Sequence, residues 1–216
     1  MCIRDSTGYV TPKEMGQNMT ANQIFESGKT IAGELTKIGI NLNLAPVADL
    51  ASDQNPSYAM RCLGSDADGV ADLLDDFVSG MREGGLSVTL RTFPGIGNVS
   101  ADVTESIAEN TDSLMTIRDT NFVPYASGIQ AGADCVMVSN AAYSKLTVKK
   151  VPAFMSQDIV TKLLREELGF DGIVMTSPLN DNVIENNYTN EFAVVEAVKA
   201  GCDLIVLPGN FKECYE

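Results

Sequence analysis

The feature that most constrains the fold is a unit, repeated five times, in which a helix-like segment leads into a short apolar segment. Apolar residues first recur with a helical period of about 3.6 residues, and a mostly apolar run follows. The helix-like segments cover residues 22–38, 66–83, 113–130, 156–168 and 190–199. The apolar segments that follow them cover residues 39–49, 86–94, 133–141, 171–179 and 202–209. A glycine stands just after each helix, where a left-handed C-cap is favoured, at Gly39, Gly85, Gly132, Gly169 and Gly201.

Two residues refine the expected boundaries of these helices. Ser156 precedes the fourth helix, and its hydroxyl is the expected N-cap. Pro124 lies inside the third helical segment and is expected to interrupt it, because proline lacks the backbone N–H that a helix interior needs.

The apolar segments predict strands that are covered on both faces, which is typical of a parallel sheet with helices outside it. Strict alternation of helix and strand indicates an α/β fold. We favour a (β/α) TIM-type barrel, and a doubly wound sheet is the alternative, although no G-x-G-x-x-G motif follows the first strand. Since a whole barrel has about eight strands, the sequence predicts an incomplete barrel over residues 7–216, preceded by a non-native or disordered leader at residues 1–6.

Composition excludes several classes of function. A net charge of −14 and a pI near 4.3 repel phosphate backbones and anionic lipid, so nucleic acid and membrane surfaces are not expected partners. No apolar run reaches the roughly 18 residues of a membrane span. The five cysteines show no CxxC spacing, and neither a metal site nor another cofactor is expected. The chain has no histidine, which excludes every mechanism that needs a histidine acid, base or ligand.

Polar residues stand near the ends of the predicted strands, where a parallel barrel builds its sites. They include Asp49, Arg91, Asn140 and Ser177. The second strand runs into LRTFPGIGNVSADVTES, residues 90–106, whose Pro-Gly turn, second glycine and acidic residues are typical of a loop that approaches a ligand.

Several segments of the chain carry a resemblance to a known family. They read GINLNLAPVADL, RCLGSD, TFPGIGNVSADV, AGADCVMVSNAAY, LLREELGFDGIVMTSPL and AVKAGCDLIVLP, in this order. Together they resemble the barrel domain of family 3 glycoside hydrolases, in particular the bacterial β-N-acetylhexosaminidase branch, from about residue 11 to the end. The resemblance implies retaining cleavage of terminal β-linked N-acetylglucosamine, with a carboxylate nucleophile and a histidine that serves as acid and base.

Most of the catalytic groups that this resemblance implies are replaced. Ser177 stands at the position of the nucleophilic aspartate and Thr104 at that of the acid/base histidine, while Asp102 matches the aspartate that orients this histidine. An alternative role for Asp102 is to cap the backbone of its own loop. The positions that the resemblance implies for sugar binding are Arg61, Arg91, Thr92, Asp49 and Asn140, of which Arg61 and Asp49 keep the family's residue type.

Three hypotheses follow from this pattern. The first is a catalytically inactive barrel that is retained to bind a sugar or muropeptide, or as a scaffold. The second is an active glycosidase that hydrolyses terminal β-N-acetylglucosamine with other carboxylates. The third is a fragment, whose partners include the missing parts of its own barrel. The sequence leaves the compartment open between the cytoplasm and an exported or cell-surface location.

Overall fold

The computed structural model describes residues 9–99, 102–148 and 150–215; the expected leader at residues 1–6 lies outside them. In the described residues a parallel sheet has the strand order β1 (Leu42–Asn43), β2 (Ser87–Phe93), β4 (Cys135–Val138) and β6 (Ile173–Thr176). The registers Leu42↔Ser87, Thr89↔Cys135 and Cys135↔Ile173 join them in sequence order. The predicted parallel α/β arrangement is therefore confirmed.

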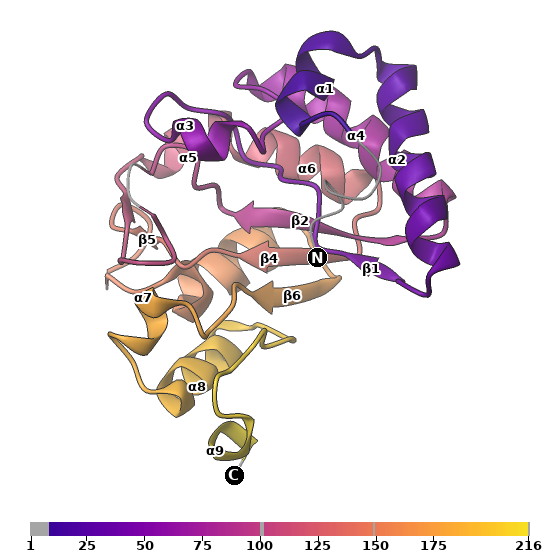
Figure 1. Cartoon of the computed structure of the whole chain (residues 1–216). Helices are drawn as coiled ribbons and strands as arrows, with labels where there is room; N and C mark the ends of the chain where they lie inside the picture. Colours follow the sequence, from indigo (N-terminus) through magenta and orange to yellow (C-terminus); the bar gives the residue numbers. More distant parts are fainter. Residues whose placement is uncertain (1–8, 100–101, 149, 216) are drawn as a thin grey trace.

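Helices follow the strands in the expected alternation. The longer ones are α2 (Ala21–Lys37), α4 (Ala67–Glu83), α6 (Phe122–Gln130), the π-helix η3 (Asp158–Glu167) and α8 (Asn190–Ala200). Figure 1 shows β2, β4 and β6 running the same way, with α2, α4 and α6 along one side of the sheet. The shorter elements are α1 (Pro12–Asn18), α3 (Pro56–Ala59), α5 (Leu114–Asp119), η2 (Ala153–Met155), α7 (Asn182–Glu185), α9 (Phe211–Tyr215) and the pair β3 (Glu109–Asn110) and β5 (Ala142–Tyr143), which the sequence did not predict.

Local capping explains where several helices begin and end. Thr20 accepts a hydrogen bond from the Gln23 N–H while the Gln23 side chain accepts one from the Thr20 N–H, which makes a capping box at the start of α2. All five glycines expected after helices have positive φ, between 69° at Gly169 and 107° at Gly201. The expectation of left-handed C-caps is therefore confirmed.

Side chains of the central strands alternate between two apolar clusters. Val136, Val138 and Val174 belong to the main core, which also contains buried side chains of α2, α4 and α6. Cys135, Met137 and Met175 belong to a second cluster with Leu42 and Val206. Because successive strand residues point to opposite faces, the second cluster lies on the face opposite the helices, which is the inner face of a barrel.

Two helix predictions were wrong. The segment 113–130 is not one helix interrupted at Pro124, since α5 ends at Asp119 and Pro124 lies within the first turn of α6. Proline is tolerated there, because the first N–H groups of a helix have no partner inside it. Ser156 is not the N-cap of η3; that position belongs to Gln157, without a side-chain capping bond.

The predicted strands are longer than the observed ones, most of all the first and the fifth. The first strand is regular only at Leu42–Asn43, because Pro46 has no N–H to give to the ladder, and Val47 then makes an isolated bridge to Arg91. The expected fifth strand is a single parallel bridge, Met175↔Leu204. There the Val206 N–H donates to the Thr176 side chain and Leu207 has a φ of 46°, so the ladder does not continue.

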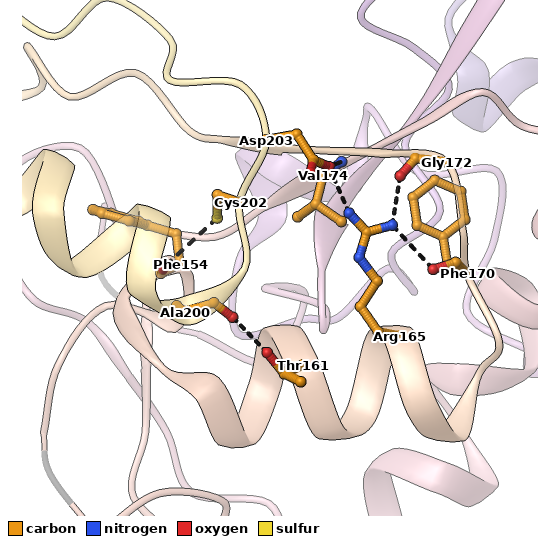
Figure 2. A network of polar contacts seen from close by, with 9 residues as sticks. All are labelled: Phe154, Thr161, Arg165, Phe170, Gly172, Val174, Ala200, Cys202 and Asp203. Atoms are coloured by element: carbon orange, nitrogen blue, oxygen red, sulfur yellow. Dashed lines mark hydrogen bonds and ion pairs between the residues drawn. The ribbon is translucent and has the colours of Figure 1, made fainter.

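Arg165 nevertheless holds the fifth segment beside β6 (Figure 2). Its guanidinium donates to the backbone oxygens of Phe170 (3.1 Å) and Gly172 (2.5 Å) and pairs with Asp203. The same Asp203 carboxylate accepts from the Val174 N–H at 2.7 Å. Side-chain contacts of Arg165 and Asp203 thus hold the segment 202–209 against β6, where few backbone hydrogen bonds join the two.

Candidate functional site

The candidate site lies where the parallel strands end. The Ser177 N–H donates to the Val138 oxygen at 2.9 Å, so the ends of β4 and β6 are side by side. The Val183 N–H donates to the Thr104 oxygen at 2.8 Å, which brings the loop after β2 against the segment after β6. Three segments that follow different strands therefore meet at one edge of the sheet.

Asp49 is the anchor of the loop after β2. Its carboxylate is completely buried and accepts hydrogen bonds from the hydroxyls of Tyr58 and Tyr125, both at 2.8 Å. It also accepts from the backbone N–H groups of Thr92 (3.0 Å) and Ile96 (3.1 Å). Burial raises the pKa of Asp49, and these hydrogen bonds act in the opposite direction. Asp49, expected to bind sugar, here uses its carboxylate to hold the protein's own loop.

Other buried groups complete the support of this loop. Asn121 Nδ2 donates to the Pro94 oxygen at 3.0 Å, and the Tyr143 hydroxyl donates to the Gly95 oxygen at 2.9 Å. Gly95 has a φ of 114°, and a Cβ there would lie 1.9 Å from Asn121 Nδ2. Only glycine therefore fits at this position. Side chains from several segments thus fix the backbone conformation of the loop after β2.

Thr92 belongs to this buried support. Its side chain is 4% exposed, and its hydroxyl lies 2.8 Å from the Tyr58 hydroxyl and 3.2 Å from Asp49 Oδ2. The residue expected among the sugar-binding groups is thus turned into the interior.

The two arginines predicted for sugar binding line the same cavity. This cavity has a volume of about 500 Å³, and segments 9–12 and 43–47 form much of its wall together with Arg61 and Arg91. Nε of Arg91 is buried and has no hydrogen-bond partner among the described residues. Asp102 and Ser177, which stand at positions that the resemblance implies for catalysis, do not line this cavity.

Ser177 and Thr104 make hydrogen bonds within the protein. Ser177 is 6% exposed, and its Oγ donates to the Val138 oxygen at 2.9 Å. Thr104 donates from its N–H (2.9 Å) and its hydroxyl (2.7 Å) to the same oxygen of Asp102. These bonds lower the pKa of Asp102, the backbone N–H having the larger effect. Asp102 caps its own loop, as the alternative interpretation of the sequence proposed.

Asp181 joins this group from the segment after β6, and the sequence analysis did not single it out. Its Oδ2 accepts from Asn140 Nδ2 at 2.9 Å. Partial burial, followed by the nearby Asp102, raises the pKa of Asp181, whereas Asn140 and Arg91 lower it. Asp181 therefore contacts Asn140, and the charges of Arg91 and Asp102 act on its carboxylate.

Comparison with known proteins decides which family this site belongs to. The family described as "Glycosyl hydrolase family 3 N terminal domain" matches residues 2–215. The chain belongs to glycoside hydrolase family 3. The resemblance stated from the sequence motifs is therefore confirmed.

Individual family 3 relatives agree with this assignment. A β-hexosaminidase of Xylella fastidiosa (strain M23) is 32% identical over 183 residues, which are 85% of this chain and 54% of that protein. A β-hexosaminidase of Stenotrophomonas maltophilia (strain K279a) is 32% identical over 82% of this chain and 52% of its own length. The chain thus spans about half the length of the β-hexosaminidases that it matches.

Solved family 3 structures share the fold. The β-N-acetylglucosaminidase of Paenibacillus sp. str. FPU-7 superimposes with a TM-score of 0.88 at 31% identity, over 91% of this chain and 38% of that one. The β-N-acetylhexosaminidase of Beutenbergia cavernae DSM 12333 gives 0.84 at 32% identity, over 93% of this chain and 60% of that one. The domain is β-N-acetylglucosaminidase-like, and its four-stranded sheet is an incomplete TIM-type barrel, as predicted.

Neither a metal site nor a membrane-spanning helix is found among the described residues. No group of three His, Cys, Asp or Glu side chains there could hold a metal ion. No helix in the same part of the chain is long and apolar enough to cross a membrane.

Proposed function

We propose that this domain is a non-catalytic family 3 barrel that binds an amino-sugar carbohydrate of the N-acetylglucosamine type, muropeptides included. The observation that carries the proposal is the hydrogen bond from Ser177 Oγ to the Val138 oxygen. The hydroxyl at the nucleophile position keeps its proton and donates it to a backbone oxygen. It therefore does not donate to a base that could activate it.

The chemistry of retaining hydrolysis supports this proposal. The reaction needs a carboxylate that attacks the anomeric carbon and an acid on the leaving oxygen, about 5 Å apart. A serine nucleophile needs an adjacent base, and no carboxylate lies within hydrogen-bonding distance of Ser177 Oγ among the described residues. The hydroxyl of Thr104 is likewise engaged by Asp102 and is no substitute for a titrating acid.

Retention of binding is supported by the parts of the site that remain. The loop after β2 keeps a rigid shape through Asp49, Asn121 and Tyr143. Arg61 and Arg91 line a cavity large enough for a small carbohydrate. Arg91 Nε there has no acceptor among the described residues, and a sugar oxygen would supply one.

Two measurements on the chain test the proposal. An aryl β-N-acetylglucosaminide should show no hydrolysis above buffer at neutral pH, while titration calorimetry should detect amino-sugar binding that Arg91→Ala removes. Absence of binding would contradict the proposed function. Turnover that Asp181→Asn abolishes would instead favour an active glycosidase with altered carboxylates, a candidate supported by the position of Asp181 beside Asn140.

We further propose that the domain's partners include strands that complete its barrel. Ile173, Leu204 and Leu207, in the edge region that contains β6 and the last segment, are 47%, 44% and 59% exposed. Exposed apolar side chains beside an unpaired strand edge favour pairing with further strands. The chain alone should therefore bind a dye that reports exposed apolar surface, and a chain that binds none would contradict this proposal.

A further inference from the structure

Asn140 is a buried amide of which only one half is satisfied. It lies two residues after the end of β4 and is 1% exposed. Nδ2 donates to Asp181 Oδ2 at 2.9 Å, while Oδ1 is buried without a partner among the described residues. The opposite orientation of the amide would point its oxygen at the carboxylate, so the assignment of the two atoms is unambiguous. A buried acceptor of this kind is costly unless a donor reaches it.

The carboxylate of Asp181 lies against the same amide. Asp181 is the N-cap residue of α7, yet its side chain makes no capping hydrogen bond. An aspartate at this position usually accepts from the helix backbone. Here the side chain turns to Asn140 instead, which places its charge over the ends of β4 and β6.

Two more carboxylates contribute negative charge beside Asp181. Asp102 and Glu105 both raise its pKa by their charges, and Arg91 is the one cation that opposes them there. Asp102 Oδ1 is occupied by Thr104, and Glu105 Oε2 accepts from Asn182 Nδ2 at 2.8 Å. The second oxygen of each carboxylate has no donor among the described residues, so the group is rich in acceptors and carries an excess of negative charge.

We propose that Asn140 and Asp181, with Asp102 and Glu105 beside them, form a subsite for the ammonium group of a non-acetylated amino sugar. An ammonium group carries three donors and one positive charge, and it can bridge Asn140 Oδ1 and the free oxygen of Asp181. An N-acetyl group offers a single N–H and no charge. The inference rests on the proposed sugar-binding function and names the form of the sugar that this site prefers.

A bound metal ion does not fit the same observations. Within the described residues, no set of three acidic, histidine or cysteine side chains is arranged to hold one. An ammonium ion needs only directional hydrogen bonds, and a buried amide oxygen beside one carboxylate supplies these.

The experiment compares two probes, glucosamine and N-acetylglucosamine, by titration calorimetry on the chain at neutral pH and low salt. We expect glucosamine to bind at least about tenfold more tightly, because a charge-assisted hydrogen bond is roughly twice as strong as a neutral one.

Asp181→Asn keeps the shape of the side chain and removes its charge, and it should abolish the preference for glucosamine. Glu105→Gln, at an exposed residue, should reduce it without risk to folding. Asp171→Asn is the matched control, since Asp171 is exposed and precedes β6 at the opposite end of the strand.

The outcomes separate this inference from the function on which it rests. Equal or tighter binding of N-acetylglucosamine, unchanged by Asp181→Asn and Glu105→Gln, would overturn the ammonium subsite and leave the sugar-binding function standing. Failure to bind either sugar would overturn both. A preference for glucosamine that Asp171→Asn also removed would overturn the assignment to Asp181, because long-range charge would then explain it.

Discussion

The hydroxyl of Tyr125 donates to Asp49 Oδ1 at 2.8 Å, although 76 residues separate the two in the chain. Both side chains are completely buried. The bond joins α6 to the segment after β1, and Asp49 in turn holds the backbone of the loop after β2. The shape of a glycosidase loop is thus maintained by groups that never reach its surface.

Tyr125→Phe should lower the free energy of unfolding by about 1.5–3 kcal/mol, because a hydrogen bond to a buried charged acceptor is lost. Urea denaturation followed by circular dichroism measures this. Tyr188→Phe is the control: Tyr188 is half-buried and its hydroxyl has no hydrogen bond among the described residues, so it should change stability by less than about 0.5 kcal/mol. Equal effects of the two substitutions would contradict the structural role of the Tyr125–Asp49 bond.

Gly80→Ala should destabilise the packing of α4 on α2 by about 1–3 kcal/mol. A Cβ at Gly80 would lie 2.1 Å from the backbone oxygen of Phe25, so one of the helices must move. Gly33→Ala, also in a helix, meets nothing within 4 Å and should be neutral or stabilising by up to about 1 kcal/mol. The comparison of the two midpoints in urea checks the close contact, and a stabilising Gly80→Ala would argue against it.

The ion pair between Arg118 and Glu167 should make stability depend on pH in the acidic range. The guanidinium contacts both carboxylate oxygens, at 2.6 and 2.7 Å, and it lowers the pKa of Glu167. A folded-state pKa below the unfolded value contributes stability at neutral pH, and this contribution is lost as the pH falls below about 4.3.

Glu167→Gln should therefore cost about 0.2–1 kcal/mol at pH 7, the size of an exposed ion pair, and almost nothing at pH 3. Denaturant unfolding at the two pH values measures the difference. The neighbouring exposed Glu166, substituted in the same way, is the control and should change little at either pH. A loss that is as large at pH 3 as at pH 7 would exclude the electrostatic explanation.

Ser177→Asp should restore slow hydrolysis of an aryl β-N-acetylglucosaminide, since an activated leaving group departs without full protonation. The control Ser177→Asn has the same shape without a nucleophilic carboxylate and should remain inactive. Adding Thr104→His should raise turnover of a natural disaccharide by about a hundredfold, the smaller end of what acid catalysis contributes. Release of the aryl group, followed by absorbance, measures the first variant. Activity of Ser177→Asn equal to that of Ser177→Asp would show that residue 177 does not lie at the reacting carbon.

The family, the alternation of helix and strand, and the left-handed glycines could be predicted because each depends on local residue pattern. Gly201 shows this well, since its φ of 107° follows from its place directly after the end of α8. Strand length could not be predicted in the same way. Residues 202–209 are mostly apolar, yet the Val206 N–H donates to the side-chain hydroxyl of Thr176 and the ladder ends.

In the candidate site, too, some features could be predicted from the sequence and others depend on the tertiary structure. The absence of histidine and the substitution at Ser177 are properties of the sequence, and they already favoured an inactive barrel. That Asp49 is enclosed by Tyr58 and Tyr125, and that Asp181 faces Asn140 across 41 residues of chain, depend on how separate strand ends meet. A strand-end carboxylate looks the same in the sequence whether it faces a ligand or a buried hydroxyl. Only the packing of the layers above it determines which donors reach it, and therefore whether it supports the fold or carries charge into the site.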